Sequence, residues 1–176
     1  MLRAIRRILL LLCVAAISGG LLLTFTTKPD LESADTAVQR AFATVRPQID
    51  QRAKALEALN AAMIKAGRKV DLADEASSTI RSWRARDSSF NDRIVTANRL
   101  STIGVRMLAI ASDSPRFASN DSVIAAANRY QQQLIDPDDR ERLNLEVDRA
   151  NAIRDGLLRR LVADALGYAD LPQLIA

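Results

Sequence analysis

The chain opens with an uncharged apolar run at its N-terminus. Residues 8–25 read ILLLLCVAAISGGLLLTF. About 20 apolar residues span the hydrocarbon core of a bilayer, and about 17 suffice when flanking residues help. With Ala4 and Ile5 added on the other side of two arginines, the run reaches that length. The pattern predicts an N-terminal transmembrane helix, and residues 1–28 are taken as a membrane anchor.

The flanking charges predict the orientation of this anchor. Arg3, Arg6 and Arg7 precede the apolar run without an acidic residue among them, whereas Lys28 is the first basic residue after it. Positive residues near a membrane helix stay on the cytoplasmic side. The sequence therefore predicts a single-pass protein of the inner membrane, with its N-terminus in the cytoplasm and its body in the periplasm or extracellular space.

Two other interpretations of the N-terminus remain open. A cleaved signal peptide would be cut near residues 16–18, where small residues have suitable spacing, but the apolar run continues to Phe25. A lipoprotein would need a small residue before Cys13, and Leu12 stands there. The length of the run favours an uncleaved anchor.

Beyond the anchor, apolar positions recur at steps of three, four and seven residues, which is typical of amphipathic helices. We predict four helices, over 38–66, 71–111, 123–134 and 137–167. The apolar positions of the first are Val38, Phe42, Val45, Ile49, Leu56, Leu59, Met63 and Ala66. In the second half of the second helix, small residues such as Ser101 and Gly104 would let a neighbouring helix approach closely.

Several residues are expected to end or bend these helices. Pro29 should end the anchor helix or mark a joint, and Pro47 should kink the first helix of the body. Residues 81–89, rich in Arg and Ser, should fray or break the second. Asp136 can cap the last helix, whose first position suits Pro137.

Composition agrees with an all-α fold. Hydrophobic residues make up 48% of the chain but aromatic residues only 4%, and there are few glycines (6) and prolines (5). Such a mixture favours helices over sheets. We expect residues 29–176 to form an elongated antiparallel bundle of about four helices.

The basic pI of 9.7 does not predict nucleic-acid binding. Without residues 1–27, the chain has 22 basic and 21 acidic residues. Phosphate neutralisation usually needs a clustered basic face. The excess charge lies beside the membrane, so lipid, and not nucleic acid, is the expected partner of the N-terminus.

The sequence also offers no catalytic constellation. It has no histidine and a single cysteine, Cys13, inside the apolar run. Histidine is the commonest general base and transition-metal ligand. We expect no enzyme activity, no metal and no cofactor.

Two asparagines are candidate register or interaction residues. Asn144 and Asn151 are seven residues apart and so lie on one face of a helix. Buried asparagines usually set register or join neighbouring helices through side-chain hydrogen bonds. We expect that structural role, with contact to a partner as the alternative.

The densest basic stretch surrounds Trp83. Its four arginines could bind lipid headgroups or an acidic partner; they are Arg81, Arg84, Arg86 and Arg93. The alternative is that they are solvated while Trp83, in step with Ile80, lies in the core. The alternation of arginines with apolar positions favours the second interpretation.

Residues 140–168, which read RERLNLEVDRANAIRDGLLRRLVADALGY, resemble the LemA family of membrane-anchored helical proteins. That family shows two Tyr-Asn pairs one heptad apart, and here Asn144 and Asn151 occupy the two Asn places while Leu143 and Ala150 replace the tyrosines. Weaker similarity over residues 41–59 and 106–120 extends the resemblance to most of the chain. It implies an N-terminal anchor followed by a helical bundle, without catalytic residues.

The sequence therefore predicts a membrane-anchored helical interaction or scaffolding protein of the bacterial envelope. An unknown envelope protein would be its partner, and self-association stays open. The alternative is an extracytoplasmic sensory domain that binds a small ligand between helices and signals through a partner.

Overall fold

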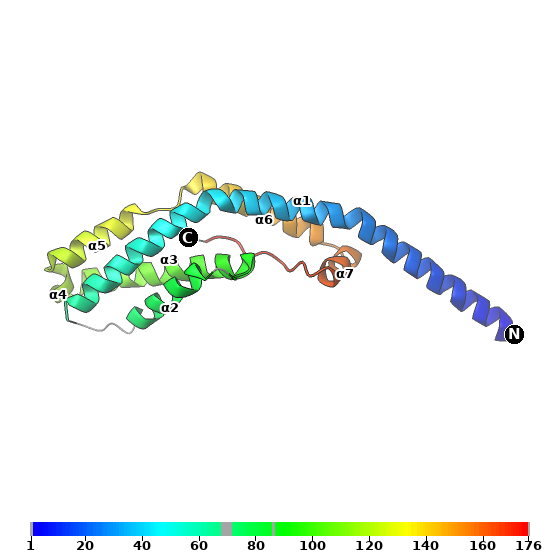
Figure 1. Cartoon of the computed structure of the whole chain (residues 1–176), viewed down its shortest axis with the longest axis horizontal. Helices are drawn as coiled ribbons and strands as arrows, with labels where there is room; N and C mark the ends of the chain where they lie inside the picture. Colours follow the sequence, from blue (N-terminus) through cyan, green and yellow to red (C-terminus); the bar gives the residue numbers. More distant parts are fainter. Residues whose placement is uncertain (1, 68–71, 86, 176) are drawn as a thin grey trace. The chain divides into compact units, whose positions relative to one another are not determined.

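The computed structural model describes the backbone of residues 2–67, 72–85 and 87–175 (Figure 1), and the side chains from Thr24 onward within these ranges, except Phe25, Leu157 and Leu158. Within these ranges the chain forms seven helices and no strand. The predicted all-α class is confirmed. The helices are α1 Leu2–Lys65, α2 Leu72–Arg84, α3 Phe90–Asp113, α4 Pro115–Ala118, α5 Asp121–Gln132, α6 Pro137–Arg154 and α7 Leu157–Ala165.

The chain divides into two compact units. The first unit combines residues 1–38 with 146–171, and the second combines 39–145 with 172–176. The predicted division into an anchor (1–28) and a bundle (29–176) stays a prediction, because most side chains of residues 1–28 lie outside the description.

The core of the second unit forms around the apolar stripe of α1. Every predicted stripe residue of α1 is buried except Ala66. In α2 and α3, which lie side by side (Figure 1), the buried residues include Ile80, Trp83, Leu100 and Met107. The helical spacing of the apolar positions thus located the α1 part of this core correctly, whereas Leu100 and Met107 were not singled out from the sequence.

In the first unit, the buried apolar side chains come from α1, α6, α7 and the segment that follows α7. They are Leu31, Val38, Val147, Ala150, Ala163 and Leu171. Each is an apolar residue that water would otherwise contact, so its burial stabilises the unit.

The predicted helix end at Pro29 is wrong. α1 continues through both Pro29 and Pro47. A proline inside a helix removes one backbone hydrogen bond and costs about 3 kcal/mol. Here both rings are exposed, and buried residues on either side of Pro47, Val45 and Ile49, hold the helix in place by packing.

The second predicted helix, over 71–111, is broken within residues 81–89, where the sequence indicated fraying or a break. α2 ends at Arg84, and Ser89 caps α3. The Ser89 hydroxyl accepts a hydrogen bond from Asp92 N (3.1 Å), and Ser89 N donates to the Asp92 carboxylate (3.3 Å). This reciprocal capping box satisfies two backbone donors and defines the start of α3.

The last predicted helix is also two helices. α6 ends at Arg154, and Gly156 has φ +108°, a conformation that favours glycine. The chain therefore turns before α7. A single helix over 137–167 would continue the apolar face of Leu143, Val147 and Ala150 to Leu161 and Ala165. Because the chain turns, Leu161 and Ala165 are exposed instead, and Ala163 is buried. With α4 also formed, the described chain has more helices than the four predicted for the body.

One described helix, α3, is long and apolar enough to cross a membrane. It also carries eight buried residues within the second unit, and a core helix of a water-exposed domain passes the same criterion. Of the predicted anchor, residues 8–23 and 25 lie outside the part of the chain whose side chains are described.

Candidate functional site

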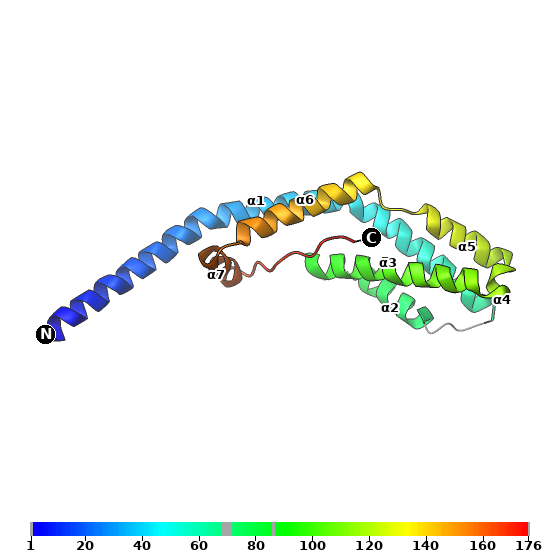
Figure 2. The same ribbon diagram turned by 180° about the vertical axis from the view of Figure 1, so that it is seen from behind.

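The segment after α7 is held by asparagine side chains. Residues 168–175 form neither helix nor strand, and we call them the C-terminal segment. Figure 2 shows it as an irregular red trace after α7. In the second unit, Asn98 of α3 and Asn144 of α6 bind its last residues. Asn144 donates to Leu174 O (2.9 Å) and accepts from Leu174 N (2.8 Å). Asn98 donates to Gln173 O (2.9 Å) and accepts from Ile175 N (2.8 Å).

These four bonds satisfy both edges of an extended chain. In a strand, the N–H and C=O of one residue point to one side, and the flanking C=O and N–H point to the other. Asn144 binds the N–H and C=O of Leu174 on one side. Asn98 binds the C=O of Gln173 and the N–H of Ile175 on the other side. The two primary amides therefore replace the neighbouring strands of a sheet, while the Leu174 side chain is 1% exposed.

The first unit contains a related arrangement. Asn151 donates to Leu171 O (2.9 Å) and accepts from Leu171 N (2.9 Å). Arg154 donates to the Asn151 carboxamide oxygen (3.2 Å) and to Ala169 O. Burial lowers the pKa of Arg154, while the nearby carboxylates of Asp170 and Asp35 oppose that shift.

Both predicted asparagines therefore bind the backbone of the C-terminal segment, where a neighbouring helix was expected. Asn98 was not singled out from the sequence. Its signal is weak, because a lone asparagine on a helix has many uses. The segment itself carried a clearer signal: Pro172 disfavours a continued helix, and leucines lie on either side of it at positions 171 and 174.

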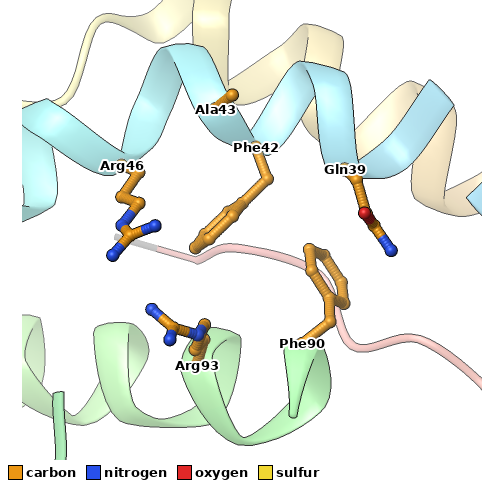
Figure 3. Close-up of a pocket in the computed structure, with 6 residues that line it drawn as sticks. All are labelled: Gln39, Phe42, Ala43, Arg46, Phe90 and Arg93. Atoms are coloured by element: carbon orange, nitrogen blue, oxygen red, sulfur yellow. The ribbon is translucent and has the colours of Figure 1, made fainter. Parts of the chain in front are cut away.

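A second feature of the second unit is an aromatic and cationic pocket between α1 and α3 (Figure 3). The Phe42 ring packs edge-on against Phe90 (centroids 5.3 Å apart, 79°) and against Trp83 (6.3 Å, 72°). A cavity of about 330 Å³ lies against these rings. It is lined by Gln39, Phe42, Ala43, Arg46, Phe90 and Arg93.

The charge around this pocket is mainly positive. The guanidinium groups of Arg46 and Arg93 point toward one another across it (Figure 3). An adjoining cavity is lined by the same two arginines together with Asp50 and Arg84. The Asp50 carboxylate accepts a hydrogen bond from Trp83 Nε1 (2.7 Å). Paired guanidinium groups bind carboxylates and phosphates, so the pocket is suited to a small anion that carries an apolar part.

Two arginines of the predicted basic stretch, Arg81 and Arg84, are exposed on α2. Arg84 also pairs with Glu57 through two hydrogen bonds of 3.1 and 2.6 Å. Arg86 lies outside the described residues. Trp83 is buried, in agreement with the prediction that it belongs to the core.

Of the predicted anchor flanks, Lys28 is exposed and lies 3.6 Å from Glu32, one helical turn away. The side chains of Arg3, Arg6 and Arg7 lie outside the description.

Replacing Glu57 with Gln is expected to have a small, pH-dependent effect. Both members of the Arg84–Glu57 pair are about half exposed, so the loss should stay below about 1 kcal/mol. The pair lowers the pKa of Glu57, so its stabilisation is present above the ordinary value of 4.5 and is lost as pH falls through the lowered pKa. Urea unfolding of both proteins at about pH 7 and about pH 3 should show the difference shrinking in acid; an equal difference at both pH values would contradict this.

Comparison with known proteins gives no match: no family model, no curated protein and no solved structure is similar to this chain at a significant level. Within the described residues, no group of three or more His, Cys, Asp or Glu side chains could hold a metal ion. The resemblance to the LemA family thus depends on the quoted residues alone.

Proposed function

We propose that this chain is a membrane-anchored interaction and scaffolding protein of the bacterial envelope, without catalytic activity. The observation that carries the proposal is the way in which the second unit holds an extended chain. Asn98 and Asn144 bind its backbone on both edges, which is a recognition geometry and not a catalytic one.

The anchor part of the proposal comes from the sequence. The apolar run of residues 8–25 follows three arginines, and the resemblance to the LemA family implies the same arrangement. α1 includes these residues, so a helix of suitable length carries them. The helical body would then stand outside the cytoplasm, where an envelope protein would be its partner.

Topology reporters test this part directly. We expect a fusion after Ala176 to an enzyme that is active only outside the cytoplasm to give a signal, and a fusion to a cytoplasm-specific reporter to give none. The positive-inside rule is the physical reason. As a matched control, replacing Arg3, Arg6 and Arg7 with Gln should weaken the orientation preference. A signal from the cytoplasmic reporter alone would overturn the proposed orientation.

The pocket at Phe42 favours a second candidate, a sensory domain for a small anionic ligand. Two arginines and two aromatic rings line one cavity of suitable chemistry. Thermal unfolding with phosphate or benzoate tests it: a stabilisation that is lost on Arg46→Gln would favour the sensor, whereas equal shifts in both proteins would exclude this pocket as the site.

A further inference from the structure

The place occupied by residues 173–175 has the properties of a peptide-binding groove. Asn98 and Asn144 contact backbone atoms only, so their hydrogen bonds do not depend on which side chains the bound segment carries. Specificity comes from the buried Leu174 side chain, whereas Ile175 is 79% exposed. A segment from another protein with a leucine at the same place would make the same four hydrogen bonds.

The groove continues into a cavity that the C-terminal segment leaves open. Ile175 borders a space of about 400 Å³ whose walls include Ser101, Val105 and Arg106 of α3. Arg52 of α1 and Asn98 also line it. The space is large enough for further residues of an extended chain.

Two buried polar groups that line this cavity lack an ion-pair or a hydrogen-bond partner among the described residues. Arg52 is 8% exposed, and it donates to the Tyr130 hydroxyl (3.1 Å) and stacks on that ring, but no carboxylate of the described residues lies within ion-pair distance. The Ser101 hydroxyl is buried and has no hydrogen-bond partner in the described part of the chain. A buried cation and a buried hydroxyl donor favour a carboxylate between them. Arg106, which lies 3.9 Å from the Glu75 carboxylate, adds a second positive charge at the same wall.

We propose that the second unit binds an extended acidic peptide segment of a partner protein in the place of residues 173–175. A leucine of that segment fills the Leu174 position, and a carboxylate that follows it lies against Arg52, Ser101 and Arg106. The C-terminal segment is the internal occupant that the partner displaces. This inference rests on the proposed interaction function and names the chemistry of its partner.

The experiment uses the full-length protein in detergent micelles and a fluorescein-labelled peptide of sequence ADLPQLIA, which repeats residues 169–176. In the wild type, the tethered segment competes at an effective concentration of order millimolar. Leu174→Lys should release it, because a charged ammonium group would replace a buried leucine side chain. We therefore expect fluorescence anisotropy to show binding at least about 10-fold tighter to the Leu174→Lys protein than to the wild type.

Two variants test the assigned contacts. Adding Asn98→Leu to the Leu174→Lys protein should abolish binding, because two backbone groups of the peptide lose their partners. A peptide with Asp in the Ile175 place should bind more tightly than the parent, and Arg52→Met in the protein should remove that gain. Peptides with a free or an amidated C-terminus tell whether a side-chain or a terminal carboxylate is bound.

Several outcomes would overturn the inference. Equal binding by the wild type and Leu174→Lys would place the peptide elsewhere, and no binding by a folded Leu174→Lys protein would exclude the groove. If both Leu174→Lys and the milder Leu174→Ala fail to fold, the segment is a required part of the core and cannot be displaced. A wild-type dimer that Leu174→Lys dissociates would make a second copy the occupant. These results do not depend on topology, so they separate failure of this inference from failure of the proposed function.

Discussion

Alanine at position 104 is expected to destabilise the second unit by about 2–4 kcal/mol, although alanine favours helices over glycine by about 1 kcal/mol. A methyl group on Gly104 would overlap the hydroxyl and ring of Tyr130 from α5. That ring is 2% exposed, and its hydroxyl accepts the hydrogen bond from buried Arg52. The ring therefore cannot move aside without breaking a bond to a charged group. Urea unfolding of the two proteins measures the difference.

A double-mutant cycle identifies the clash as the cause. If the methyl group acts through the Tyr130 ring, Gly104→Ala should cost little in a Tyr130→Ala background, where the ring is gone. Val105→Ala, at an exposed neighbouring position of α3, controls for helix propensity and should change stability by less than about 0.5 kcal/mol. Equal costs of Gly104→Ala in both backgrounds would exclude the ring overlap.

Gly104 also shows how far the sequence predicts packing. Its small size predicted that a neighbouring element approaches α3 closely, and the structure places Tyr130 of α5 there. The identity of the neighbour could not be predicted, because helical spacing defines which face of a helix is buried but not what covers it. The buried stripe of α1 could be predicted because it requires only the buried face, which the spacing of three and four residues determines.

The helix boundaries that differ from the prediction have two physical origins. Pro29 was expected to end the anchor helix or mark a joint, and Pro47 to kink the first helix of the body, but α1 continues through both. There, packing exceeds local propensity: each exposed proline ring costs one hydrogen bond, whereas the burial of Val45 and Ile49 persists only if the helix continues. At Gly156, the break agrees with local propensity, because a φ of +108° favours glycine.

The candidate site was predicted in part. The spacing of Asn144 and Asn151 placed both on one helix face and suggested hydrogen bonding to another element. The partner of these amides is irregular backbone, which has no periodic signal, so neither the C-terminal segment nor Asn98 could be found from the pattern. The pocket at Phe42 unites α1 with α3, and a sequence does not show which residues on two distant helices meet.

Replacing Asn144 with Leu should lower the free energy of unfolding by about 2–3 kcal/mol, because the buried N–H and C=O of Leu174 would lose their partners. Leucine has similar volume and favours helices, so the cost comes from these two backbone groups. Hydrogen exchange measured by mass spectrometry should also rise in peptides covering residues 171–176. Asn128→Leu, at an exposed position of α5, is the matched control and should leave both measurements unchanged.

The Asn144→Leu effect should disappear when the C-terminal segment is already released. In the Leu174→Lys protein, the segment no longer covers Asn144 and water solvates its side chain. Replacing Asn144 there should lower the free energy of unfolding by less than about 0.5 kcal/mol. Strong coupling of this kind means that Asn144 stabilises the fold through the segment alone. An undiminished cost would mean instead that Asn144 supports α6 directly, and the groove would then lose one of the two side chains that hold an extended chain on both edges.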